Sequence, residues 1–343
     1  MKNYYVLIAS KKYEIEYMYG ELAKNENCKI IYLDHMLQNK WLWRFSSRFF
    51  NSSKIDFVIP KKIKFALRKC IQNKYANYCR SYFSKQINIS DEKIKNSNIC
   101  FIIMARIYEE FGNTITKYLR KNYSDAILAS YFVDVVASFK CPVKDYYSSF
   151  DKIYSFDKTE CKKYDFTYCL EPFTYHAIEN ENREPEYDVT FIGVAKDRLD
   201  DILSVYEKLK AHNLRLDFWI FGVKDENQKY KEEIHYNSYL SFDDFIKHSL
   251  NARCTFETLQ KNGSSPTTRF SMCMLYKRKL LTNCTELLDS EWTDALATNN
   301  IQVYKDLDSI NYEWIKKDCE YDNQKYIELF STDKMIETMD KAL

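Results

Sequence analysis

The feature that most constrains the fold of this sequence is an alternation of short apolar runs with amphipathic stretches. Runs of this length suit strands that are buried on both faces, and the stretches between them carry apolar residues at helical spacing. Such an alternation is typical of a parallel sheet covered by helices. In the first half we expect a helix over 16–26 and strands over 3–10, 28–34, 98–108, 124–134 and 150–157.

A second alternation follows a polar, acidic stretch that Pro172 and Pro185 bracket. A length of 343 residues suits two domains better than one. We therefore predict two Rossmann-like α/β domains, residues 1–172 and 187–343, joined by a linker over 173–186. In the second half we expect strands over 187–193, 215–222, 252–260 and 278–283, and helices over 198–212, 241–250, 269–277 and 333–343.

Cysteine usage indicates the compartment. The chain has 11 cysteines, an odd number, and no C-x-x-C pair among them. This pattern favours reduced thiols in a cytosol over a disulfide framework or a zinc site. No apolar run approaches the roughly 20 residues that span a bilayer, and the N-terminus has no small-residue cleavage site. We expect a cytoplasmic protein with no bound metal.

Charge is unevenly distributed, although the net charge is only +2. Residues 1–100 carry 19 Lys and Arg against 8 Asp and Glu, whereas the remainder carries 32 against 41. Within the basic part, the segment 40–69 interleaves Trp and Phe with Lys and Arg. This segment either binds an anionic membrane surface or forms a core helix with one solvated face. A role in nucleic-acid binding is disfavoured because no known module is present.

Three of the five glycines, Gly193, Gly222 and Gly263, follow expected strands of the second domain. Ligands of open α/β sheets bind outside the carboxyl ends of the strands, where glycine permits a close approach; simple turns are the alternative explanation. The loop 261–270, "KNGSSPTTRF", adds hydroxyls, backbone N–H groups and Arg269 at the start of a helix, which suits a phosphate. Neither a Walker loop nor G-x-G-x-x-G occurs, so ATP and nicotinamide cofactors are disfavoured.

The stretches "YDVTFIGVAKDRLDDIL", "YNSYLSFDDFIKHSL" and "TFETLQKNGSSPTTRFSMCMLYKRKLLTN" resemble bacterial glycosyltransferases of capsule, exopolysaccharide and lipopolysaccharide O-antigen assembly. The resemblance covers roughly residues 150–310, including "FDKIYSFDKTECKKYDFTYCLEPF". It implies the GT-B architecture, in which two Rossmann-like domains face a cleft and a C-terminal helix crosses back to the N-terminal domain. In that family the C-terminal domain binds the nucleotide-sugar donor and the N-terminal domain holds the acceptor.

The resemblance also implies a set of donor-binding positions. The family commonly has Arg-x-x-Glu at the donor loop, whereas this chain has Met272 where the Glu is expected. Ser271 or Glu257 substitutes for that carboxylate, or donor binding is altered, or activity is lost; we favour altered binding. The implied donor-binding residues are Gly193 and Arg198 beside the diphosphate, Gly222, Tyr239 near the base, and Gly263, Ser264, Ser265, Thr267, Thr268, Arg269 and Met272 of the donor loop.

An inverting enzyme needs a base that deprotonates the acceptor hydroxyl. Charged residues at expected strand ends of the N-terminal domain are the candidates, together with a histidine of the linker that is placed to face the cleft. Retention and inversion are not distinguished by the sequence. The candidate bases are Glu14 or Glu16, Asp34, His35, Glu109 and His176.

These inferences together predict a metal-independent glycosyltransferase at the inner face of the cytoplasmic membrane. It would transfer a hexose from a nucleoside-diphosphate donor, UDP being favoured, to a lipid-linked oligosaccharide. One alternative is a non-catalytic protein that binds nucleotide sugars or glycans on the same fold. Another is an enzyme that acts on nucleotide-linked or phosphorylated small molecules without glycosyl transfer.

Overall fold

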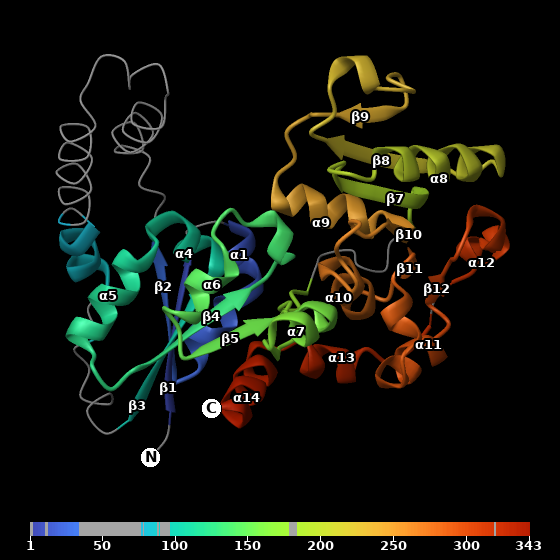
Figure 1. Cartoon of the computed structure of the whole chain (residues 1–343). Coiled ribbons are helices and arrows are strands. Elements are labelled where there is room, and N and C mark those ends of the chain that lie inside the picture. Colours follow the sequence, from blue (N-terminus) through green and yellow to red (C-terminus); the bar gives the residue numbers. More distant parts are fainter. Residues whose placement is uncertain are drawn as a thin grey trace, which may run out of the picture. The chain divides into compact units, whose positions relative to one another are not determined.

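The structure, a computed structural model, describes residues 3–10, 13–33, 77, 79–87, 89, 97–177, 184–318 and 320–343. The described residues contain two six-stranded sheets (Figure 1). They group into two compact units, one built from residues up to Tyr154 and one from Ser155 to Ala342 together with Tyr17–Glu21. Each sheet is described by itself below.

The first sheet has the strand order β2-β1-β3-β4-β5-β6. The pairs β1–β2, β1–β3 and β3–β4 are parallel. The side chains of β1, β3 and β4 are almost all buried, as expected for strands that are covered on both faces. The elements are β1 (Asn3–Ser10), α1 (Tyr13–Tyr19), η1 (Gly20–Lys24), β2 (Cys28–Leu33), β3 (Asn98–Met104), α4 (Ala105–Phe111), α5 (Asn113–Asn122), β4 (Ile127–Phe132), η4 (Val136–Ser138), α6 (Val143–Tyr147), β5 (Lys152–Ser155), α7 (Lys158–Tyr164) and β6 (Thr167–Tyr168).

The second sheet has the order β12-β11-β10-β7-β8-β9, and all five strand pairs are parallel. Its elements are β7 (Tyr187–Val194), α8 (Leu199–Ala211), β8 (Leu216–Phe221), η5 (Asp225–Asn227), β9 (Ile234–Tyr236), α9 (Phe242–Leu250), β10 (Ala252–Glu257), α10 (Thr268–Leu275), β11 (Lys279–Thr282), η6 (Thr285–Leu288), η7 (Ser290–Trp292), α11 (Thr293–Ala297), β12 (Ile301–Val303), η8 (Leu307–Ser309), α12 (Tyr312–Lys316), α13 (Gln324–Leu329) and α14 (Thr332–Ala342).

Helices cover both faces of this second sheet. On α8, the buried residues are Ile202, Val205, Tyr206 and Leu209, which have the i, i+3, i+4, i+7 spacing of an amphipathic helix. They pack in one core with sheet residues that include Phe191, Phe218 and Phe256. The helix α9 lies on the opposite face, where it contacts β7 and β10. Its start is fixed by the hydroxyl of Ser241, which accepts a hydrogen bond from the Asp244 N–H at 3.1 Å.

The prediction of two Rossmann-like α/β sheets is confirmed. Three short strands, β6, β9 and β12, were not expected, because two or three residues are too few to show a period. The run 98–108, predicted as one strand, is a strand only to Met104 and then becomes the helix α4. Both segments are apolar because both are buried, so hydrophobicity does not mark the boundary.

The C-terminal helix expected over 333–343 is present as α14. Within the second unit it contacts the segment after β6, where the Cys169 thiol donates to the Met335 carbonyl at 3.9 Å. The expectation that this helix crosses back to the first domain stays a prediction. In the part of the chain that the structure describes, no helix is long and apolar enough to span a bilayer.

Candidate functional site

The strand order of the second sheet locates a candidate ligand site. From β7 the chain proceeds outward through β8 to β9, and it then returns to the other side of β7 for β10, β11 and β12. The order reverses between β7 and β10, and ligands of such sheets bind in the crevice outside the carboxyl ends of the strands at that point. Strand β7 ends with Gly193 and Val194, and β10 ends with Glu257.

Arg269, in the first turn of α10, reaches the carboxyl end of β7. Its Nη2 donates to the carbonyl of Ile192 at 2.7 Å, and its guanidinium carbon lies 5.5 Å from the centre of the Phe191 ring. Its Nε is buried and has no hydrogen-bond partner among the described residues. Among the described residues, Arg269 also forms no ion pair with a carboxylate. An N–H group of a charged side chain is therefore buried at the switch point without a hydrogen-bond partner. Such a group calls for an explanation, and an anionic ligand supplies one.

Gly193 makes room for this guanidinium. A Cβ atom at position 193 would lie only 2.6 Å from Nη2 of Arg269, closer than side-chain atoms pack. Any other residue at position 193 would therefore displace the guanidinium from the place that it takes here. This is a different use of glycine from the close ligand approach that the sequence suggested.

Glu257 is a buried carboxylate whose charge acts on Arg269. It is fully buried, and its two oxygens accept hydrogen bonds from the hydroxyls of Thr267 and, at 2.7 Å, Thr282. Burial lowers the pKa of the Arg269 guanidinium, and the Glu257 charge opposes that effect. The Thr267 hydroxyl also accepts from the Arg269 N–H at 3.3 Å and so caps α10. Glu257 thus orients the start of α10 through Thr267.

Arg198 ties the ends of β7 and β10 together. The residue is buried, and its guanidinium donates to the carbonyl of Val194 at 3.3 Å and to the carbonyl of Thr258. A second tie runs from the Lys261 N–H to the Asp197 carboxylate at 3.2 Å. In this structure Arg198 contacts protein carbonyls at the crevice, and a diphosphate contact for it stays a prediction.

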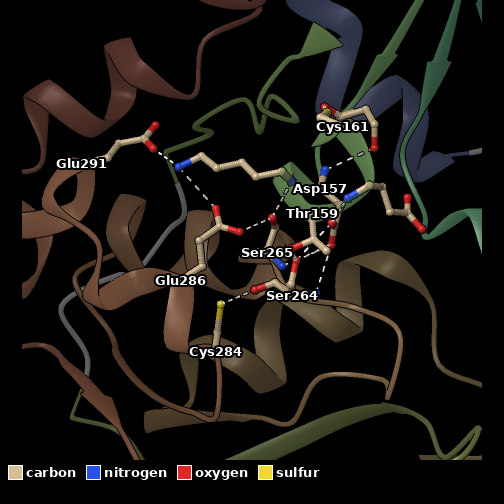
Figure 2. Close-up of polar contacts among 11 residues, drawn as sticks. Asp157, Thr159, Cys161, Ser264, Ser265, Cys284, Glu286 and Glu291 are labelled. Atoms are coloured by element: carbon tan, nitrogen blue, oxygen red, sulfur yellow. Dashed lines mark hydrogen bonds and ion pairs between the residues drawn. The ribbon is translucent and has the colours of Figure 1, made fainter. Parts of the chain in front are cut away.

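Ser264 and Ser265 of the loop 261–270 bind an anion that the chain itself supplies (Figure 2). Their N–H groups donate to Oδ2 of Asp157, at 3.0 Å from Ser264 and 3.3 Å from Ser265. The sequence suggested that these groups are free to bind phosphate. In this structure they bind the Asp157 carboxylate, and a phosphate contact for them stays a prediction.

The remaining donor-binding candidates lie in different environments. Thr268 begins α10 and is half-buried. Met272 is fully buried in the core under α10, so its side chain is closed to a ligand in this structure. Tyr239 is 91% exposed between β9 and α9, and Gly222 takes the left-handed φ of 74° with its N–H bound to Asn237. The Gly263 N–H donates to the Gln260 carbonyl at 2.9 Å.

Among the candidate bases, His176 is the only described one in the second unit. Its Nε2 lies 3.0 Å from the Tyr17 carbonyl, and because a carbonyl only accepts, Nε2 carries a proton in this contact. Glu109, in α4, accepts from Arg106 at 2.9 Å and from the Lys140 N–H. Glu14 is half-buried in α1. Asp34, His35 and the segment 40–69 lie outside the described residues.

Sequence analysis missed Asp157 and its neighbour Glu286 as partners of the donor loop. The series Asp157-x-x-Glu160 is a helix-start signal, and Asp157 does accept from the Glu160 N–H at 2.9 Å. Its contact with Ser264, 107 positions further along the chain, leaves no local sequence signal. Among the described residues no group of three or more His, Cys, Asp or Glu side chains is arranged to hold a metal ion.

No protein-family model matches this sequence, and no curated protein matches it at a significant level. Solved structures do match. An α-glucosyltransferase solved with UDP-glucose and DNA aligns with a TM-score of 0.49 and 9% identity, over 99% of this chain and 93% of that one. A glycosyltransferase from Rickettsia africae gives 0.48 and 11% over 100% and 93%, and a UDP-forming trehalose-phosphate synthase from Burkholderia vietnamiensis gives 0.48 and 9% over 99% and 96%. Since these TM-scores are below 0.5, the similarities do not say what this chain binds.

Proposed function

We propose that this protein is a glycosyltransferase that binds a nucleoside-diphosphate sugar at the switch point between β7 and β10. The observation that carries the proposal is Arg269, a half-buried arginine whose Nε is buried without a hydrogen-bond partner among the described residues and which forms no ion pair there. A diphosphate at the strand ends would accept from this group in a charge-assisted hydrogen bond.

The same arrangement suits the chemistry of glycosyl transfer. Cleavage of the bond to the sugar leaves negative charge on the departing nucleoside diphosphate. Arg269 and the N-terminal end of α10, where Thr267 and Thr268 lie, are fixed before the reaction and face that charge. Groups that are already oriented stabilise the developing charge without reorganisation.

Several finer features of the proposal rest on the sequence alone. A UDP-linked hexose as donor, a lipid-linked oligosaccharide as acceptor, attachment to the inner face of the membrane through 40–69, and catalysis without a metal stay predictions. A non-catalytic protein that binds nucleotide sugars is the alternative. It is favoured by Met272, which occupies the position of an expected donor-binding carboxylate and is fully buried.

Turnover of a nucleotide sugar tests the proposal. The purified protein is incubated with UDP-, GDP-, dTDP-, ADP- and CMP-linked sugars, and release of free nucleotide is followed. We expect release from one of them, at least slowly to water, and loss of most of that activity in Arg269→Gln. The control is Arg215→Gln. Arg215 pairs with Asp188 at the amino ends of β7 and β8, which is the end of the sheet away from Arg269. Binding without turnover would favour the non-catalytic alternative.

A further inference from the structure

The loop between β10 and α10 is held by a carboxylate from another part of the chain. Asp157, which immediately precedes α7, accepts the N–H of Ser264 and that of Ser265 on one oxygen. The Ser264 hydroxyl lies 3.0 and 3.1 Å from the two carboxylate oxygens (Figure 2). Both residues belong to the second unit, so this contact lies within one compact body.

The Asp157 carboxylate is fully buried, and its hydrogen bonds account for that burial. It accepts three backbone N–H groups, from Glu160, Ser264 and Ser265, in addition to the Ser264 hydroxyl. A buried carboxylate is costly unless its oxygens are bonded in this way. The same bonds use up the donors of the loop, so the Ser264 and Ser265 N–H groups are not available to a ligand while Asp157 is in place.

A second set of contacts fixes the other side of Ser265. Its hydroxyl accepts from the Lys158 N–H at 3.0 Å and donates to Glu286. The Lys158 ammonium lies 3.5 Å from the other oxygen of Glu286 and also pairs with Glu291. Burial raises the pKa of Glu286, and Ser265 and Lys158 oppose that effect. The loop is therefore held by hydrogen bonds to Lys158 of α7 and to Glu286 of η6, which follows β11.

We propose that Asp157 is a positioning residue that orders the loop so that its second half, Thr267 to Arg269, is held ready for the anionic ligand. This inference rests on the proposed function for the identity of the ligand. It divides the loop in two: Ser264 and Ser265 bind Asp157, and Thr267, Thr268 and Arg269 face the ligand. Preorganisation of this kind strengthens binding because less disorder is lost when the ligand arrives.

The variant Asp157→Asn separates the two roles of this side chain. Asn caps a helix about as well as Asp, so α7 keeps its start. An amide, however, has only one accepting oxygen, and its NH₂ group cannot accept the Ser264 and Ser265 N–H groups that Oδ2 now takes. The matched control is Asp306→Asn, which alters the carboxylate that caps η8 and accepts the Ser309 N–H at 2.9 Å.

Two measurements on the full-length protein test the proposal. Hydrogen exchange of the peptide containing 262–268 reports on the loop, and calorimetric titration with UDP, GDP, dTDP, ADP and CMP reports on the ligand site. We expect Asp157→Asn to speed exchange of the loop amides about tenfold. We also expect it to weaken binding of the nucleotide that the wild-type protein prefers about tenfold. Asp306→Asn should change neither.

Unchanged exchange in Asp157→Asn would overturn the proposal, because the carboxylate would then not order the loop. Faster exchange with unchanged or tighter nucleotide binding would overturn it as well, since Asp157 would then be a competing anion. If the wild-type protein binds none of the nucleotides, the proposed function fails. In that case the exchange result alone decides, with faster exchange supporting the ordering role and unchanged exchange refuting it.

Discussion

At the residue scale, Gly193 and Arg269 depend on each other. The guanidinium Nη2 occupies the space in which a Cβ of residue 193 would lie, at 2.6 Å. Sequence analysis named both residues as donor-binding candidates, because strand ends and a glycine-containing loop are local signals, but it did not pair them with each other. It could not show that the glycine serves the arginine, nor that Asp157 takes the N–H groups of Ser264 and Ser265, because those contacts join distant parts of the chain.

Gly193→Ala is therefore expected to displace Arg269 from the Ile192 carbonyl. Because the displaced atom is the end of a flexible side chain, the unfolding free energy should change little, whereas nucleotide binding should weaken. The control is Gly20→Ala, because a Cβ at Gly20 would meet no atom within 4 Å. Urea unfolding and nucleotide titration of both variants make the comparison. Equal behaviour of the two alanine variants would contradict the account of Gly193.

At the scale of elements, long periodic segments were predicted well and short ones were not. The helix α8 and the strands β7, β8 and β10 lie where the pattern placed them, whereas β9 and β12 are three residues each. Short elements are stabilised by tertiary contacts rather than by their own sequence. The five-residue helix α12 is an example, since its last carbonyls are satisfied by the buried Lys279 of β11.

Lys279→Met should destabilise the second unit. The Lys279 ammonium donates to the carbonyls of Trp314 and Lys317, and its removal takes this donor from the Lys317 carbonyl and leaves the Trp314 carbonyl with the Lys317 N–H at 3.2 Å. We expect a loss of about 1–3 kcal/mol, seen as a lower urea midpoint. Lys316→Met is the control on the same helix, because Lys316 is exposed and, among the described residues, forms an ion pair with Glu313 alone. Equal urea midpoints for Lys279→Met and Lys316→Met would refute this role of Lys279.

At the scale of the whole molecule, the strand order of the second sheet connects fold to function. The alternation in the sequence predicts parallel sheets, but it does not give the order of strands, because order depends on crossover connections rather than on local pattern. The order β9-β8-β7-β10-β11-β12 places the switch point between β7 and β10. There Gly193, Arg269 and the buried Glu257 come together, although Gly193 precedes the other two by more than 60 positions in the chain.

The most direct test of the central claim is a calorimetric titration of the wild-type protein, Arg269→Gln and Arg215→Gln with UDP, GDP, dTDP, ADP and CMP. The account predicts that the wild-type protein and Arg215→Gln bind one of these nucleotides alike. It predicts that Arg269→Gln, while still folded, binds that nucleotide at least about tenfold more weakly, which corresponds to a loss of about 1.4 kcal/mol. Equal affinity in Arg269→Gln, or no binding of any of the five to the wild-type protein, would contradict it.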